Sequence, residues 1–170
     1  IYVYCLKHKK LWIMKNQFES AQNIIEIYKK HARAWTELRG NFLYEKAWLD
    51  HFLALIPQHS KILDLGCGSG KPIADYLIQH DHKITGVDSS DVMIEMARQN
   101  FPEQHWLQAD MRTIEFDHKF NAILAWDSFF HLTPNDQRQM FSQFARLAQQ
   151  GTVLMFSSGP SHGEAIGDLF

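Results

Sequence analysis

The stretch Lys61-Ile62-Leu63-Asp64-Leu65-Gly66-Cys67-Gly68-Ser69-Gly70 decides the fold of this 170-residue chain. Its first five residues predict a short, mostly apolar strand, and its alternating glycines predict a tight turn. Pro72 is typical of the first turn of a helix, so a helix is expected over 72–79. A strand, a glycine turn and a helix place free N–H groups where a ligand can bind them.

Strands and helices alternate along the chain on both sides of this turn. Two helices are predicted before it, over about 17–38 and from 42 to before Pro57. Thr133 to Asp136 open a later helix that Gly151 ends, and the segment 111–119 predicts only a turn. The predicted strands are 61–65, 83–88, 105–109, 120–126 and 153–157. The alternation favours a doubly wound, Rossmann-like α/β fold with a mostly parallel sheet of about five strands.

The length suits one domain. Residues 1–13 are expected to lie outside its core, because Met14 resembles a normal start. The domain over 14–170 is then divided into a helical lid over 14–57, a core over 58–158 and a tail over 159–170.

Composition excludes several classes of function. The net charge of −2 and scattered Lys and Arg give no basic surface for nucleic acid, and no apolar run is long enough for a membrane span. Cys5 and Cys67 form no CxxC pair, so neither a thiolate metal site nor a disulfide framework is expected. We expect a cytoplasmic protein with no bound metal.

Three ligand classes use a glycine turn of this kind. A phosphate-binding loop needs glycine where Leu65 stands and a hydroxyl residue where Pro72 follows Lys71, which excludes it. A dinucleotide fingerprint needs a small residue at Lys71, and no Tyr has a Lys four residues later. An NAD(P)-dependent oxidoreductase therefore remains only an alternative hypothesis, and S-adenosylmethionine (SAM) is the third class.

Acidic residues stand at the ends of four successive predicted strands: Asp64, Asp88, Asp110 and Asp127. Because parallel strands end at the same edge of a sheet, where ligands bind, these carboxylates are expected to line one site. Any single Asp at such a place is equally explained as a turn former or helix cap. Because only 19 of the 170 residues are acidic, four acids at four successive strand ends predict a functional site rather than a coincidence.

The Asp64-x-Gly66-x-Gly68-x-Gly70 turn, with Gly86-Val87-Asp88 ending the next strand, resembles the motifs of class I SAM-dependent methyltransferases. The resemblance covers about residues 28–158. It implies SAM as cofactor, S-adenosylhomocysteine as product and a small molecule as methyl acceptor. The implied cofactor-binding residues are Tyr28, Trp35, Asp64, Gly66, Cys67, Gly68, Gly70, Asp88, Ser89, Asp110, Met111, Trp126 and Asp127.

The resemblance also implies individual roles. Asp64 would serve the amino-acid end of the cofactor, and Asp88, which lies 20 residues past Gly68, would accept hydrogen bonds from the ribose. Asp110, with the amide of Met111, would bind the adenine. Trp126 would face the sulfonium cation, and Asp127 would lie where the family places methyl transfer.

Two histidines, His131 and His162, follow the fourth and fifth predicted strands at the edge where ligands bind, and His131 is the favoured general base. His80, His82 and His118 precede strands and fall at the opposite edge. In the implied lid, Tyr28 and Trp35 share one helix face with a spacing of seven, and Arg39 lies nearby. For Trp35, core packing is the favoured interpretation.

The family's sheet ordinarily has seven strands, and the sequence predicts no counterpart of the last two. We therefore expect a C-terminally truncated domain whose last strand, 153–157, is an exposed edge prone to self-association. A SAM-binding fragment without catalytic activity is the second alternative function.

Overall fold

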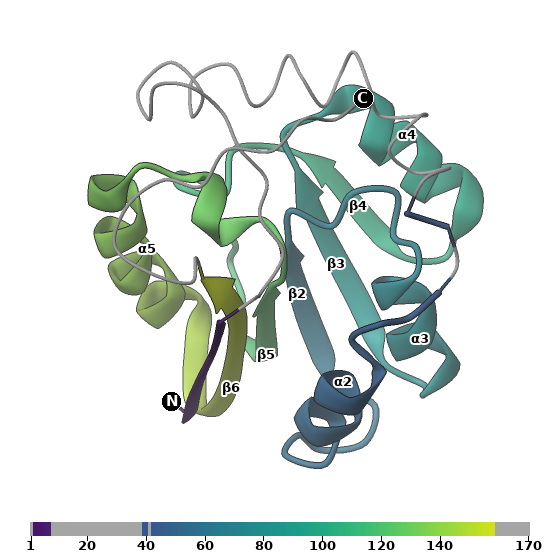
Figure 1. The fold of residues 1–170 in the computed structure, drawn as a ribbon, viewed down its shortest axis with the longest axis horizontal. Coiled ribbons are helices and arrows are strands. Elements are labelled where there is room, and N and C mark those ends of the chain that lie inside the picture. The colour runs from purple at the N-terminus through teal and green to yellow at the C-terminus, as the bar shows by residue number, and fades with distance from the viewer. Residues whose placement is uncertain (1, 8–38, 41, 159–170) are drawn as a thin grey trace.

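The computed structural model describes residues 2–7, 39–40 and 42–158, the first of these segments by its backbone alone. Its strands form one parallel sheet in the order β1-β6-β5-β2-β3-β4 (Figure 1). The strands are β1 Tyr2–Lys7, β2 Lys61–Leu65, β3 Lys83–Asp88, β4 His105–Gln108, β5 Phe120–Ala125 and β6 Ala148–Ser158. The helices are α2 Lys46–Leu53, α3 Ile73–Gln79, α4 Asp91–Asn100, the 3₁₀ turn η1 Phe129–His131 and α5 Pro134–Leu147. The predicted parallel α/β fold is confirmed.

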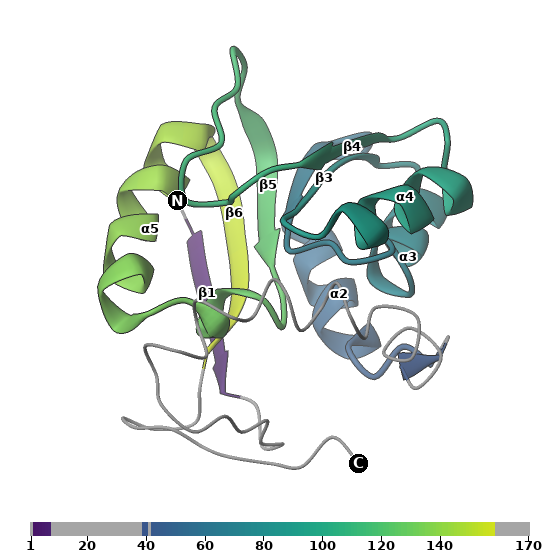
Figure 2. The same cartoon turned by 90° about the horizontal axis from the view of Figure 1, so that it is seen from above.

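Helices cover both faces of the sheet, as Figure 2 shows, with α2, α3 and α4 on one side and α5 on the other. Successive strand residues point to opposite faces, so Ile62 packs with the three-helix side and Leu63 with α5. Both are fully buried, which explains why these strands are almost continuously apolar.

Several predicted boundaries are confirmed because local chemistry sets them. Ser90 caps α4 by accepting a hydrogen bond from the amide of Met93, and Thr133 caps α5 by accepting one from Asp136. The segment 111–119 contains a turn and no helix, as expected.

The prediction that Gly151 ends a helix is wrong. α5 ends at Leu147, and β6 begins at Ala148 without a loop. Gly151 instead lies inside an irregularity of the β5–β6 pairing, with φ at +84°. Thr152 closes that irregularity, since its hydroxyl accepts from the Gln149 amide and donates to the carbonyl of Phe120. A bulge with positive φ favours glycine, and so does the end of a helix. The glycine alone therefore did not distinguish the two structures.

The placement of residues 1–13 outside the domain is corrected for part of that segment. β1 lies parallel to β6, with Tyr2 opposite Val153 and Lys7 opposite Ser158. β6 is therefore an interior strand, and the expected self-association through its free edge loses its basis. A single-sequence reading missed β1 because an edge strand needs little periodicity once a neighbour supplies its hydrogen-bond partners.

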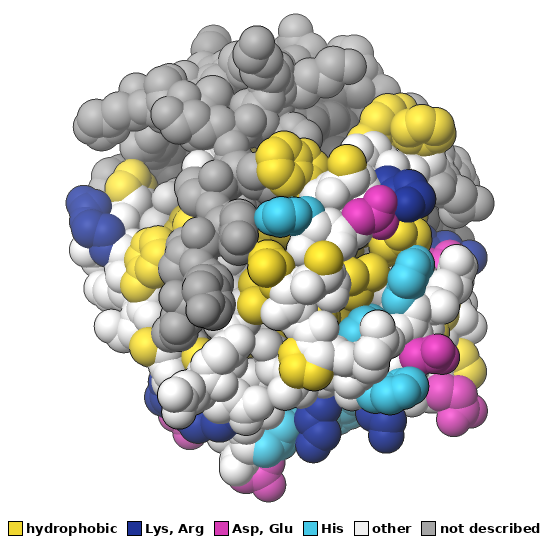
Figure 3. All heavy atoms as spheres, turned by 90° about the horizontal axis from the view of Figure 1, so that it is seen from below, with side chains coloured by type: hydrophobic (Ala, Val, Ile, Leu, Met, Phe, Trp, Pro, Cys, Tyr) yellow, Lys and Arg dark blue, Asp and Glu magenta, His cyan; other side chains and the backbone are white. Residues whose placement is uncertain are grey.

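Two predicted segments lie outside the described residues: the helix over 17–38, with Tyr28 and Trp35, and the tail over 159–170. Within the described segments, no helix is long and apolar enough to cross a membrane. On the face shown in Figure 3, Lys and Arg side chains are interspersed with acidic and histidine side chains.

Candidate functional site

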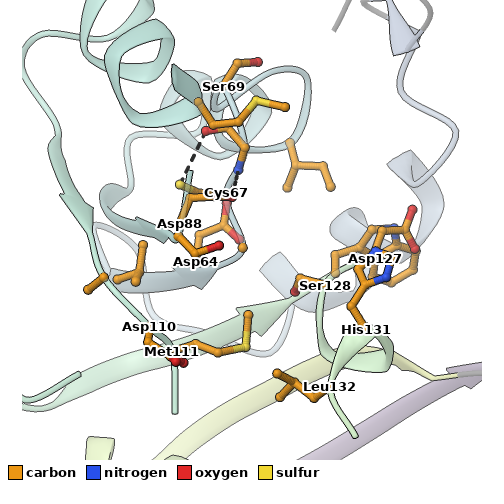
Figure 4. Close-up of a pocket in the computed structure, with 18 of the residues that line it drawn as sticks. Asp64, Cys67, Ser69, Asp88, Asp110, Met111, Asp127, Ser128, His131 and Leu132 are labelled. Carbon is orange, nitrogen blue, oxygen red and sulfur yellow. Dashed lines mark hydrogen bonds between the residues drawn. The ribbon is translucent and has the colours of Figure 1, made fainter. Parts of the chain in front are cut away.

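A cavity of about 500 Å³ opens at the carboxyl ends of the strands. That volume falls in the range of small-molecule and cofactor sites. Figure 4 shows Asp64, Cys67 and Asp88 on one side of it, Asp110 and Met111 on another, and Asp127, Ser128 and His131 on a third. Of the predicted site residues, those that line the cavity are Asp64, Gly66, Cys67, Gly68, Asp88, Ser89, Asp110, Met111, Trp126, Asp127 and His131.

The three glycines of the turn have different physical reasons to be glycine. All have positive φ, at +79° for Gly66, +54° for Gly68 and +77° for Gly70. A Cβ on Gly66 would lie 2.2 Å from the Cβ of Ser128, whereas one on Gly68 would find only the Met93 sulfur at 4.0 Å. A Cβ on Gly70 would press on Phe101 and Trp106 at 3.1 Å, and Gly70 is not among the cavity-lining residues. Gly68 is thus the position where the backbone is bare toward the cavity.

Asp64 and Asp88 form an acidic pair at the ends of β2 and β3, and Asp64 is buried whereas Asp88 is half-buried. Asp88 accepts hydrogen bonds of 2.9 Å from the Gly68 and Ser90 amides, one on each carboxylate oxygen. Burial, followed by the charge of Asp88, raises the pKa of Asp64 to about 7. Burial also raises the pKa of Asp88, although its backbone hydrogen bonds lower it in part. This end of the cavity favours a ligand that brings positive charge.

Cys67 lies near both acids as a free, buried thiol. Burial and the two nearby carboxylates raise its pKa well above the ordinary value, so the thiol stays protonated. Among the described residues, no group of three or more His, Cys, Asp or Glu side chains is arranged to hold a metal ion.

Asp110, at the end of β4, has a cationic partner that the sequence analysis missed. Arg112 donates through Nη2 to Oδ2 of Asp110 at 2.6 Å and through Nε to both carboxylate oxygens at 3.0 Å. Burial alone would raise the pKa of Asp110, but the hydrogen bonds and charge of Arg112 hold it below its usual value. Arg112 also reaches Asp136 in the first turn of α5, at 3.1 Å.

Asp127 adopts an unusual backbone conformation, with φ at +48°. Ser157 of β6 holds it there: the Ser157 hydroxyl accepts from the Asp127 amide at 2.7 Å and donates to its carboxylate at 3.2 Å. The neighbouring Ser128 hydroxyl donates to the carbonyl of Leu65 at 2.6 Å. The chain after β5 is thereby fixed against both the glycine turn and β6.

His131 ends η1, next to this fixed segment. Burial lowers its pKa to about 4, and a hydrogen bond with the Asp127 backbone offsets part of that effect. The imidazole is therefore neutral near pH 7, as a general base must be. Trp126 lines the cavity and is only 4% exposed.

Arg39 and Glu45 form an ion pair at the cavity wall, with Nη2 of Arg39 2.5 Å from Oε1 of Glu45. The second carboxylate oxygen of Glu45 is buried and has no hydrogen-bond partner among the described residues. Arg39 was expected near the site from the implied lid. Glu45 was not, because a lone Glu at the start of a helix gives no signal. Other lining residues that the sequence analysis missed include Ser69, Lys71, Arg112, Ser128, Leu132, Thr133 and Asp136.

Known proteins resemble this chain both in sequence and in fold. YqeM of Bacillus subtilis (strain 168), which is assigned as a methyltransferase, is 33% identical over 136 residues, covering 76% of this chain and 54% of that protein. A TehB-like SAM-dependent methyltransferase from Corynebacterium glutamicum is 26% identical, with a TM-score of 0.58 over 82% of this chain and 73% of that one.

Magnesium protoporphyrin IX methyltransferase from Synechocystis, solved with bound SAM, shares the fold at 19% identity. Its TM-score is 0.61 over 80% of this chain and 74% of that one. The chain spans about half the length of the curated relatives it matches. Residues 62–151, more than half of the chain, match the family described as methyltransferase domain. The chain belongs to this methyltransferase family.

Proposed function

We propose that the cavity binds SAM and that the protein transfers its methyl group to a small-molecule acceptor. The observation that carries this proposal is the convergence of the glycine turn, Asp88 and the Asp110–Met111 segment on one cavity. The names of the relatives point to the same cofactor. The acceptor of the Synechocystis enzyme, a porphyrin, supports the small-molecule class.

The residues fit the parts of such a cofactor. Each oxygen of Asp88 accepts one backbone hydrogen bond and retains lone-pair capacity for a ribose hydroxyl. The bare backbone at Gly68 allows a ligand to approach closely, because no side chain stands between it and the cavity. Asp64 would face the ammonium of the amino-acid end, where the buried carboxylate gains a positive partner.

When bound, SAM supplies a methyl group on a positively charged sulfur. The chain's own contribution is to align the acceptor behind that carbon and to exclude water. In this proposal Trp126 faces the sulfonium, and Asp127, held by Ser157, forms the wall beside it. His131 would take the proton from an acceptor that must lose one, and the cavity needs no base for an acceptor already ionised.

Isothermal titration with S-adenosylhomocysteine tests the binding step. Binding should be present in the unmutated chain, and Asp88→Asn should weaken it about 10- to 100-fold, the usual size for a hydrogen bond to a charged group. Asp91→Asn is the matched control, since Asp91 is an exposed acid three residues away. Binding of NAD but not of S-adenosylhomocysteine would overturn the proposal in favour of an oxidoreductase.

A panel of hydroxyl, amine and carboxylic acid acceptors with radiolabelled SAM tests the transfer step. Turnover that His131→Asn lowers while cofactor affinity stays constant would identify the base. Binding without turnover across the panel would favour a cofactor-binding role without catalysis. A cytoplasmic location and the lack of a nucleic-acid partner stay predictions.

A further inference from the structure

The wall of the cavity opposite the glycine turn is held together by one guanidinium. Arg112 bonds both oxygens of Asp110 through its side chain, and its backbone amide also donates to Asp110 Oδ1 at 2.9 Å. Its remaining arm contacts Asp136, two residues into α5. Asp110, Arg112 and Asp136 all line the cavity.

This geometry fixes the direction of the Asp110 carboxylate. A fork of two parallel N–H groups sets the plane of a carboxylate, which a single ammonium would not. The turn that begins at Asp110 is closed by its own carbonyl, which accepts from the amides of Thr113 and Ile114. Backbone and side chain of Asp110 are therefore both constrained before any ligand arrives.

The same contacts connect two elements that are far apart in sequence. The backbone amide of Asp136 donates to the hydroxyl of Thr133, which caps α5, and the Asp136 carboxylate accepts from Arg112. Arg112 therefore links the end of β4 to the start of α5. Without the guanidinium, Asp110 and Asp136 would face each other as like charges. Removing Arg112 should thus turn the Asp110 carboxylate away from its present direction as well as remove its partner.

We infer that Arg112 is a positioning residue for nucleobase recognition: it orients the Asp110 carboxylate to accept a hydrogen bond from the exocyclic amino group of an adenine. The inference rests on the proposed function and deepens it. It assigns the preference for adenine over a 6-oxo purine to a residue that need not touch the base.

The test compares two ligands that differ only at that group, S-adenosylhomocysteine and S-inosylhomocysteine, by titration calorimetry on the full chain. The unmutated protein should prefer the adenosine form at least about 100-fold, because a carboxylate repels the 6-oxo group. In Arg112→Met this ratio should fall about tenfold or more. Arg112→Lys, which keeps the charge but not the fork, should give an intermediate ratio.

Arg146→Met is the matched control. Arg146 is as exposed as Arg112, at 45% against 44%, and pairs with Glu115 on the surface, but it does not line the cavity. Its removal should leave the ratio unchanged even where melting temperature falls as much as in Arg112→Met. Melting temperatures of all variants therefore separate positioning from general stability.

Three results would overturn the inference. The ratio could remain unchanged in both Arg112→Met and Arg112→Lys, or it could fall equally in Arg146→Met. The unmutated chain could also prefer neither ligand. Failure of the unmutated chain to bind S-adenosylhomocysteine at all would instead remove the proposed function, so the two failures are distinguishable.

Discussion

Two ends of one cavity each carry an aspartate, and the pKa values of these two aspartates are shifted in opposite directions. At the glycine-turn end, burial and then the charge of Asp88 raise the pKa of Asp64 to about 7. At the β4 end, Arg112 outweighs burial and holds the pKa of Asp110 below its usual value. Asp64 lies near the end of β2 and Asp110 follows β4, two strands away in the same sheet. The difference in pKa therefore comes from what packs against each carboxyl group.

The comparison indicates a division of labour. At the β4 end Arg112 compensates the charge of Asp110, which suits a neutral group such as a nucleobase. The glycine-turn end keeps buried carboxylates that lower the stability of the unliganded protein and that a cationic ligand would stabilise. The ionised forms of Asp64 and Asp88 are disfavoured in the unliganded protein, at the place where a positively charged ligand would compensate them.

The largest expected effect comes from disrupting the close contact between Gly66 and Ser128 at the glycine-turn end of the cavity. Gly66→Ala should lower the free energy of unfolding by about 3–5 kcal/mol, because the new Cβ meets Ser128 and the residue must keep a positive φ. Gly68→Ala is the control, since it shares the positive φ but has open space, and should lose about 1 kcal/mol. Urea denaturation measures both, and equal losses would contradict the close approach to Ser128.

Removing the buried charge at Asp64 should sharpen the contrast by making the protein more stable. The folded-state pKa is above the unfolded value, so the folded state binds more protons and stability falls as pH rises from about 4 to about 7. Asp64→Asn should therefore stabilise the unliganded protein by about 2–4 kcal/mol at pH 8 and by little at pH 4. Denaturation at both pH values measures this, and a stability loss at pH 8 would refute it.

The same carboxyl should make ligand binding depend on pH. A cationic amino-acid end prefers ionised Asp64, so S-adenosylhomocysteine affinity should rise about 10- to 100-fold between pH 5 and pH 8 and level off above about 7. Titration of Asp64→Asn should give a flat profile with weaker binding. A profile that keeps its slope in that variant would assign the pH dependence to another group.

The smallest effect is expected at the β4 end. Asp110→Asn should lower stability by less than about 1 kcal/mol near pH 7, because its ion pair with Arg112 is partly exposed to solvent. The lowered pKa means that this contribution is present above pH 4 and lost as pH falls below it. Asp117→Asn, at an exposed acid paired with His118, is a control that should show no measurable change. A gain in stability for Asp110→Asn would erase the contrast with Asp64.

The sequence by itself determined the fold class, the glycine turn and the edge of the sheet where the acids gather. These follow from local rules: hydrophobic runs set strands, Ser90 and Thr133 set helix starts, and parallel strands bring their ends to one edge. Tertiary structure alone decided the pairing of β1 with β6, the bulge at Gly151 and the cavity-lining position of Glu45. Each depends on a partner distant in the chain.

The protonation states of the aspartates could not be predicted from the sequence either, because an aspartate's pKa depends on burial and on the charges around it. Asp64 and Asp110 look alike as residues at strand ends, and only the packed structure buries Asp64 beside another acid and places an arginine beside Asp110. Sequence located the carboxylates, and the environment built by the fold determined their charge.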